Sequence, residues 1–271
     1  MKKTIYTLLV AFCLCACEVI HEDNRIIDLD PQLLPTNAKT HILIEYTGFT
    51  CVNCPNAAAE AHHLLDTYNN LIVVEMHPAS NPFTQTKKEE FNYTCPAADI
   101  YYTYMGGTPT TSFPKGNLDF TLNSSGEYMS LYPEWSAMLA SVSSDTTILD
   151  MGLQPTWNES TQSVDIQLDI MPKTTDTLEC QVLFWVIEDH IIGAQSMPDG
   201  SSNMEYEHNH VLRTAIGDEW GQACHLTGTT TTINTTCVWN NKWVKGNCQV
   251  VAVVLDSANK QVMHSCKANI K

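Results

Sequence analysis

The chain carries two cysteines separated by two residues, in the sequence CVNC at residues 51–54. The preceding residues 41–49, HILIEYTGF, are apolar, β-branched and aromatic, which is typical of a buried strand. The residues after Cys54 are rich in alanine and have apolar side chains at helical spacing. A thiolate at a helix N-terminus is stabilised by free N–H groups and the helix dipole. Cys51 is therefore the candidate nucleophile for disulfide exchange, and Cys54 the thiol that resolves the mixed disulfide.

Two further features make this region resemble the thioredoxin family. Thr108-Pro109, in the sequence GTPT, resembles the loop in which a cis-proline faces the cysteine pair and the preceding residue pairs with substrate backbone. Glu45, six residues before Cys51, resembles the buried acid that assists proton transfer from the resolving cysteine. A carboxylate in an apolar strand should have a raised pKa. The resemblance thus implies catalytic roles for Cys51, Cys54, Glu45, Thr108 and Pro109.

Other interpretations of these residues stay open. The cysteine pair could form a permanent structural disulfide, and Glu45 could be an acid at a sheet edge. A zinc site is less favoured, because no second Cys-X-X-Cys or matched histidine pair lies at finger spacing. The thioredoxin sequence Trp-Cys-Gly-Pro-Cys is absent, since Thr50 precedes the pair and Val52-Asn53 fills it. The redox potential of that family therefore cannot be transferred to this chain.

The N-terminus has the pattern of an export signal. Two lysines precede an apolar run that is shorter than the roughly 20 residues needed to span a bilayer. The run ends in LCAC, which resembles the bacterial lipobox and implies that Cys17 is acylated and begins the mature chain. The alternative is an ordinary signal peptide that ends near a cysteine. We expect a signal peptide at 1–16 and an acidic tether at 17–37, which holds the protein to the membrane through lipid.

Periodicity divides the rest of the chain in two. Residues 38–145 show an α/β order: strand, helix, strand, a partly helical stretch at 86–104 interrupted by Pro96, two strands at GTPTTSF and NLDFTL, and a helix at 132–143. This order predicts the thioredoxin-like domain. Residues 146–271 contain alternating runs separated by turn-rich stretches, which predict an all-β sandwich of immunoglobulin-like architecture with roughly seven or eight strands.

Charge and cysteine content limit the partners. Residues 1–16 contain two lysines and no acid, so the mature chain has 12 basic and 30 acidic residues and a net charge near −18. This charge opposes binding to nucleic acid. Eight cysteines follow Cys17, as expected of an exported chain that can form disulfides. Cys248 and Cys266 flank a predicted hairpin at SAN, where we expect them to lie close together and to be able to form a bridge.

The second half carries a distinctive motif, YEHNHVLR at residues 206–213. With ECQVLFWVIEDHIIGAQS and TGFTCVNCPNA, it resembles the outer membrane protein 28-related family of lipoproteins, which implies a thioredoxin-like domain followed by a β-rich domain in the outer membrane of the cell envelope. On one strand, Tyr206, His208 and His210 would share a face and could form a metal site. We favour a hydrogen-bonded polar cluster without metal, because no third ligand is evident, and we expect Arg213 to pair with an acid.

Two functions remain open. The first is a thiol-disulfide oxidoreductase of the envelope that acts on protein thiols or disulfides. The second is a surface binding or adhesion module for an extracellular ligand, in which the thioredoxin fold is a scaffold. The cysteine pair favours the enzyme, and the large β-domain and additional cysteines favour the binder. No cofactor is expected for either function.

Overall fold

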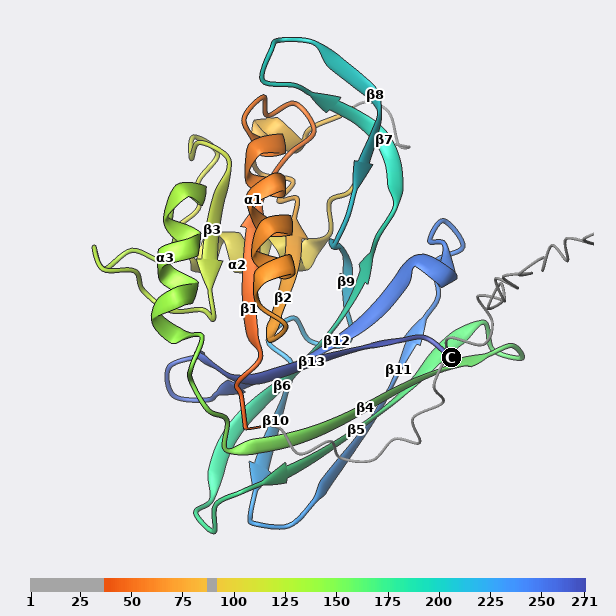
Figure 1. The fold of residues 1–271 in the computed structure, drawn as a ribbon. Helices are drawn as coiled ribbons and strands as arrows, with labels where there is room; N and C mark the ends of the chain where they lie inside the picture. The colour runs from red at the N-terminus through yellow and green to blue at the C-terminus, as the bar shows by residue number, and fades with distance from the viewer. Residues whose placement is uncertain (1–36, 87–91) are drawn as a thin grey trace, which may run out of the picture. The chain divides into compact units, whose positions relative to one another are not determined.

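Strands dominate the part of the chain that the computed structural model describes, residues 37–86 and 92–271 (Figure 1). The predicted signal peptide, Cys17 and nearly all of the tether lie outside these residues. No helix within the two ranges is long and apolar enough to cross a membrane. In chain order the elements are β1 (His41–Tyr46), α1 (Cys54–Thr67), β2 (Leu71–Met76), η2 (Pro82–Thr84), α2 (Pro96–Tyr104), β3 (Lys115–Leu118), α3 (Tyr132–Val142), β4 (Leu149–Asn158), β5 (Ser163–Pro172), β6 (Leu178–Glu188), β7 (Ile191–Ser196), β8 (Ser202–His208), β9 (Val211–Ala215), β10 (Gln222–Leu226), β11 (Thr231–Val238), η4 (Lys245–Asn247), β12 (Cys248–Asp256) and β13 (Val262–Asn269).

Three predictions for the first half of the chain differ from the structure. Pro96 occupies the first turn of α2 and begins the helix, so the predicted interruption is wrong. A proline fits there because the first-turn N–H has no intrahelical partner. The strand predicted at GTPTTSF is not formed, because Thr108–Thr111 is a turn closed by the Thr111 N–H on the Thr108 carbonyl. The NLDFTL strand ends at Leu118, where Asp119 and then Phe120 adopt positive φ.

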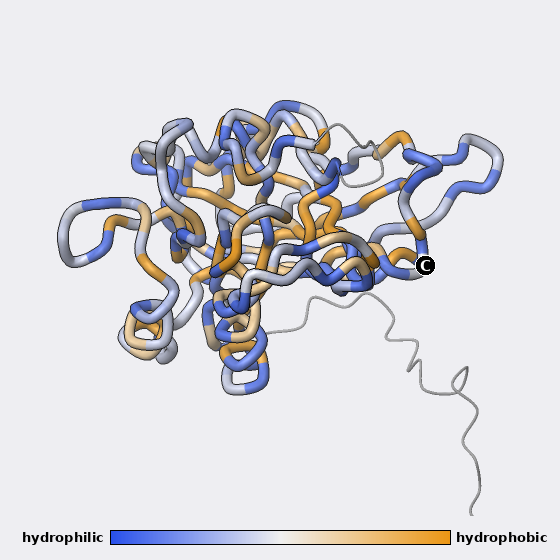
Figure 2. Tube along the Cα trace, turned by 90° about the horizontal axis from the view of Figure 1, so that it is seen from above, coloured by the Kyte–Doolittle hydropathy of each residue, from blue (hydrophilic) through white to orange (hydrophobic). Residues whose placement is uncertain are grey.

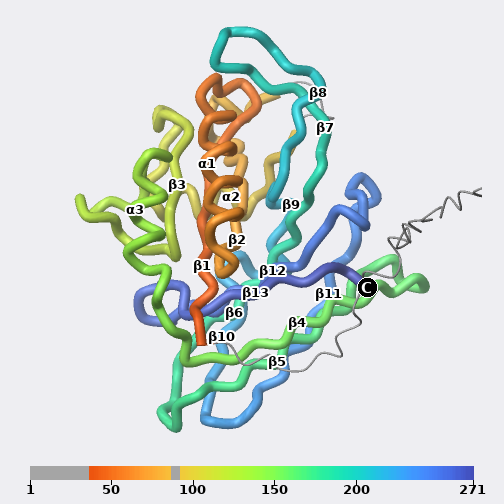
Figure 3. Tube along the Cα trace, in the orientation of Figure 1, coloured from red at the N-terminus to blue at the C-terminus, as the bar shows by residue number. Residues whose placement is uncertain are grey.

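One large sheet contains strands of both halves. Its order is β13-β12-β6-β9-β2-β1-β3, and β10 also pairs with β6. The strands β1 and β2 are parallel, and β3 is antiparallel to β1. A single pair, Glu75 and Val211, joins β2 to β9, which lie side by side in Figure 3. A three-stranded sheet, β11-β5-β4, and the β7-β8 hairpin complete the strands of the described residues. The domain boundary near residue 145 stays a prediction, and the sheet runs across it.

The strands β6 and β12 are buried on both faces. From β6, Trp185 and its alternate neighbours pack in a core with Tyr101 and Tyr102 of α2. The intervening residues, Phe184 among them, pack against β5 in a second core. Burial on both faces explains why these strands read as continuous apolar runs in the sequence. A third core lies between α1, α3 and the β1-β2 pair, and apolar segments are concentrated in the middle of the trace in Figure 2.

Candidate functional site

The two cysteines of the CVNC sequence form a disulfide at the start of α1. Their Cα atoms are 5.4 Å apart. Cys54 is the first residue of the helix, and Pro55 occupies its first turn. β1 ends at Tyr46, and the intervening loop turns back on itself through the Cys51 N–H, which donates to the Gly48 carbonyl at 2.9 Å. The parallel β1-β2 pair therefore delivers the cysteines to its carboxyl edge, which is a common place for functional groups in α/β sheets.

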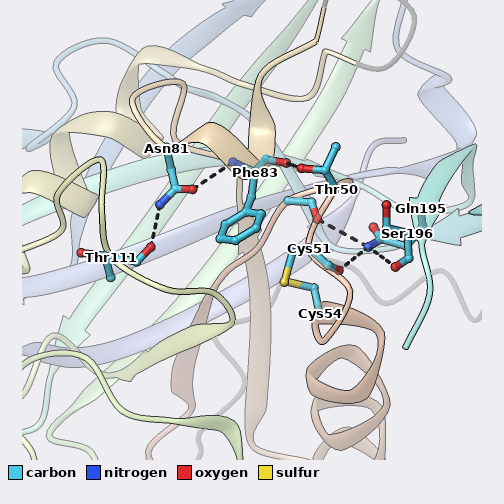
Figure 4. The surroundings of a disulfide bond; sticks show 9 residues. Thr50, Cys51, Cys54, Asn81, Phe83, Thr111, Gln195 and Ser196 are labelled. Carbon is cyan, nitrogen blue, oxygen red and sulfur yellow. Dashed lines mark hydrogen bonds between the residues drawn. A yellow bond between two sulfur atoms is a disulfide. The ribbon is translucent and has the colours of Figure 1, made fainter. Parts of the chain in front are cut away.

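Contacts from distant segments enclose the disulfide (Figure 4). The Thr50 hydroxyl donates to the Phe83 carbonyl at 3.0 Å. The approach of the two segments needs Gly48, because a Cβ atom there would lie 2.5 Å from the Phe83 carbonyl oxygen. From β7, the Gln195 amide donates to the Cys51 carbonyl at 2.9 Å, and the Ser196 N–H donates to the Phe49 carbonyl at 2.8 Å. Residues of the second half thus close over the cysteine loop.

This enclosure buries both cysteines. Each is 2% exposed, so the proposed nucleophile Cys51 is no more accessible than Cys54. Part of the enclosure comes from β7, and no local pattern around residue 51 reveals its contacts with the loop. Val52, between the two, is 44% exposed and is the part of the motif that solvent reaches.

The cis-proline is also a different residue from the predicted one. The cis peptide bond of the described residues is Phe113–Pro114, immediately before β3. Thr108–Pro109 is not cis, because Pro109 lies at the second position of the 108–111 turn, which a trans proline fits. The Phe113 ring packs 5.9 Å from that of Phe83 and belongs to the same core as the two cysteines.

The predicted bridge between the last two cysteines is not formed. Cys248 and Cys266 are both free, as are Cys95, Cys180, Cys224 and Cys237. Cys266 pairs with Ala252 across the hairpin, four residues from Cys248, which places the thiols roughly 13 Å apart along the strands. The register also shifts between Val254 and Leu255. Burial raises the pKa of the Cys95 thiol to about 11, so it stays protonated at neutral pH.

Glu45 lies in the middle of a group of buried ionisable side chains. It is fully buried and pairs in register with Glu75 of β2. Burial, and secondarily the Glu75 carboxylate, raise the pKa of Glu45 well above its usual value, while the Thr47 hydroxyl opposes this shift. Burial and Asp189 raise the pKa of Glu75 to about 8. A role for Glu45 in proton transfer at Cys54 stays a prediction.

The histidines of the YEHNHVLR motif do not share a strand. β8 ends at His208, and His210 follows at φ 58° and pairs with Asp189 at 3.0 Å. His208 turns inward, with its ring 4.9 Å from that of Tyr206 and 6.4 Å from that of His77. Burial lowers the pKa of His208 to about 4 and, with His208 and Arg213 as smaller causes, lowers that of His77 well below its usual value.

Two residues of this group were missed by the sequence analysis. Glu75 and His77 stand two apart at the end of the apolar run LIVVEMH, where an acid and a histidine on one face are the signal to look for. Arg213 pairs with Glu188 at 3.3 Å, in agreement with the expected pairing to an acid.

The comparisons with known proteins decide the family. The sequence model of the outer membrane protein Omp28 family matches residues 98–271, which is more than half of the chain. The chain belongs to the Omp28 family. Membership confirms the expected location in the outer membrane of the cell envelope. No match was found among curated proteins.

The fold of this Omp28-family protein is similar to that of one solved structure. HBP35 of Porphyromonas gingivalis is similar over 88% of this chain and 77% of its own, with a TM-score of 0.66 at 12% sequence identity. A domain of the outer membrane lipoprotein Omp28 from the same organism matches 46% of this chain and 89% of its own, at 18% identity and a TM-score of 0.34. At 12% sequence identity, the similarity to HBP35 shows the fold alone.

Proposed function

We propose that this Omp28-family protein is a lipid-anchored thiol-disulfide oxidoreductase of the outer membrane. Residues 38–145 form its thioredoxin-like unit, residues 146–271 an immunoglobulin-like β-sandwich, and Cys17 carries the lipid. The parallel β1-β2 pair, antiparallel β3 and flanking helices support the thioredoxin-like assignment. The observation that carries the redox function is the Cys51–Cys54 disulfide at the start of α1, at the carboxyl edge of that sheet.

The chemistry follows from the position of each sulfur. A thiolate of a partner dithiol attacks the oxidised pair, which gives a mixed disulfide and a free Cys54 thiolate. The partner's second thiolate then displaces Cys51, so that the partner is oxidised to a disulfide and the pair takes up two electrons and two protons. Each step reverses when the reduced pair meets a partner disulfide, which is then reduced to a dithiol. The free N–H groups at the start of α1 stabilise the Cys51 thiolate.

Access to Cys51 requires the β7 strand to move. Both sulfur-bearing residues are 2% exposed, and the hydrogen bonds from Gln195 and Ser196 hold β7 against the loop. Loss of one such bond, worth about 1 kcal/mol, should open the loop about fivefold more often. We therefore expect Gln195→Ala to be reduced by dithiothreitol about fivefold faster. Gln222→Ala, which changes an exposed glutamine on β10, is the matched control.

The decisive experiment traps partners in cells. A Cys54→Ser variant should accumulate mixed disulfides through Cys51, and Cys51→Ser should accumulate none. Cys95→Ser serves as the control, because Cys95 is a buried thiol outside the pair.

The same burial favours a second candidate, in which the disulfide is structural and the protein is a surface binding module. In that case the pair stays oxidised in reducing glutathione buffers, no mixed disulfide forms in either variant, and the redox proposal is wrong.

A further inference from the structure

Three buried side chains converge at the carboxyl end of β2. Ligand atoms of Glu75, His77 and His208 all lie within 4.8 Å of one another. Glu75 lies in β2, His77 directly follows the strand, and His208 is the last residue of β8. We propose that these three residues form a zinc site, which is distinct from the cysteine pair and independent of the redox function.

The ligand His77 is otherwise without a role. It is 2% exposed, and neither of its ring nitrogens has a hydrogen-bond partner. Buried polar atoms are nearly always satisfied, and leaving one unpaired costs about 1–3 kcal/mol. A neutral imidazole with a free nitrogen in an apolar strand is a good metal ligand. Binding of a cation by His77 would supply the missing partner.

The ligand His208 already has a hydrogen-bond partner for one of its ring nitrogens. Its Nε2 lies 3.3 Å from the Ala194 carbonyl, to which it donates. Metal-binding histidines commonly donate their second ring N–H to a carbonyl or carboxylate, which fixes the tautomer and leaves the other nitrogen to bind the ion. The Ala194 carbonyl would play this part, and Nδ1 of His208 would carry the lone pair.

The local charge calls for a cation. Glu45 and Glu75 lie directly opposite each other on parallel strands, and both are buried. Neither oxygen of Glu45 accepts a hydrogen bond of normal geometry. The nearby guanidinium of Arg213 is engaged by Glu188. Two neighbouring buried acids can both lose their protons only beside a compensating positive charge, which a divalent ion would supply.

The set of donor atoms selects the kind of ion. Two imidazole nitrogens and one carboxylate oxygen are a ligand set of zinc, and magnesium and calcium prefer oxygen ligands alone. Zinc ligands lie about 2.0–2.2 Å from the ion, so binding would draw the three atoms slightly together. A fourth position remains for water. The Tyr93 hydroxyl is buried and without a hydrogen-bond partner, and its ring packs against that of His208, so it is the candidate to bind that water.

A cavity adjoins Tyr93, whose ring packs against both histidine ligands. The Tyr93 ring packs 5.5 Å from the ring of His77 and 4.9 Å from that of His208. Tyr93 also lines a cavity of about 770 Å³ between β6, β7 and the segment around Trp243. Rotation of this one side chain would open the cavity to the ligands. The expectation of a metal-free cluster rested on the lack of a third ligand, which β2 supplies.

The test measures metal binding to the whole chain, purified from membranes in detergent with its disulfide oxidised and then treated with a chelator. Titration with Zn²⁺ should show one tight site and raise the melting temperature. Co²⁺ should bind in its place with the visible spectrum of a four-coordinate ion and no sulfur-to-cobalt absorption. Glu75→Gln and His77→Asn should each lower the affinity by more than the roughly 10–100-fold that changes around a metal site cost.

Control variants distinguish this site from other side chains that could bind zinc. His225→Asn and His190→Asn remove exposed histidines that pair with Glu179 and Glu207, and should bind zinc as the unchanged protein does. The double variant Cys51→Ser/Cys54→Ser keeps all three zinc ligands and should still bind one zinc ion, so the two proposals can fail separately.

The proposal is overturned if the unchanged protein binds no zinc, or if only the exposed histidine variants lose it. It is also overturned if Glu75→Gln, a near-isosteric change, folds normally and retains the affinity. Should His77→Asn fail to fold, the Glu75→Gln result decides.

Discussion

His264 shows how a single buried histidine ties β13 to the start of β1. Its Nδ1 accepts a hydrogen bond from the Thr40 N–H at 3.1 Å, and the neighbouring Ser265 hydroxyl donates to the Thr40 carbonyl at 2.8 Å. The side chain is 2% exposed. Burial lowers the pKa of His264 to about 4, with Lys173 as the next cause, whereas Asp150 acts in the opposite direction. The folded protein therefore needs the neutral imidazole.

This shift predicts acid sensitivity. Between about pH 6.5 and pH 4 the unfolded chain binds a proton at His264 and the folded chain does not, so the free energy of unfolding falls as the pH falls. Above pH 6.5 the neutral His264 imidazole makes its full contribution to the free energy of unfolding. Below pH 4 this contribution, about 3 kcal/mol, is lost. In His264→Asn, whose amide oxygen can also accept from Thr40, this part of the pH dependence should be absent. Urea unfolding of both proteins at pH 7 and pH 4.5 measures the difference, and equal slopes would contradict the assignment.

At the residue level, the sequence predicted chemistry well where the signal was local. The disulfide of Cys51 and Cys54 and the burial of Glu45 follow from a motif and one apolar strand. The cis-proline was assigned to Pro109 and not to Pro114, because the strand was predicted to begin at GTPTTSF, whereas β3 begins at Lys115, directly after Pro114. His77 was missed because its partner His208 is 131 positions away.

Among the elements, the close packing of β3 against α3 depends on a glycine. A Cβ atom at Gly116 would lie 2.5 Å from the indole ring of Trp135, which is 1% exposed. The ring fills the space above the strand, so a larger residue at 116 displaces the helix.

We expect Gly116→Ala to lower the free energy of unfolding by about 1–3 kcal/mol, the usual result of overpacking a core. Gly246→Ala is the control, since a Cβ there meets no atom within 4 Å. Thermal unfolding of the two variants tests the difference. Equal melting temperatures would mean that α3 can move to make room for the added methyl group without any loss of stability.

The type of an element was predictable where burial gives its apolar residues a recognisable pattern in the sequence. β6 and β12 are continuous apolar runs because both faces are buried, and α1 has its apolar residues on one face. The partners of these strands were not predictable. The pairing of β9 with β2 joins residues far apart in the chain, and a single pair of residues, with no repeating pattern, marks it.

For the whole molecule, the largest core belongs to both halves. Tyr101 and Tyr102 of α2 pack with Trp185 of β6, whose indole N–H donates to the Tyr101 hydroxyl at 3.0 Å. Trp220 adds a second ring 5.3 Å from that of Tyr101. Removal of the second half would expose this aromatic surface.

We therefore expect residues 38–145 alone to aggregate or to remain without fixed tertiary structure. Residues 33–271 should unfold in one cooperative transition, with equal calorimetric and van't Hoff enthalpies. Two separate transitions, or a well-folded 38–145 fragment by near-ultraviolet circular dichroism, would contradict a shared core.

The predicted site of membrane attachment, Cys17, lies outside the described residues. Cys17→Ala should move the protein from the membrane to the soluble fraction, because acyl chains alone would hold it there. Cys13→Ala, a change within the predicted signal peptide, is the control. Membrane retention of the Cys17→Ala protein, without lipid mass on its N-terminus, would exclude the anchor.

The β7-β8 hairpin reaches both candidate sites. β7 contacts the cysteine loop through Gln195 and Ser196, and β8, with which it is paired, ends at His208. Displacement of the hairpin to uncover Cys51 would pull on a zinc ligand. By thermodynamic reciprocity, the factor by which zinc hinders reduction of the disulfide equals the factor by which reduction weakens zinc binding. The zinc concentration and the redox potential of the surroundings would then shift the same conformational equilibrium of one molecule.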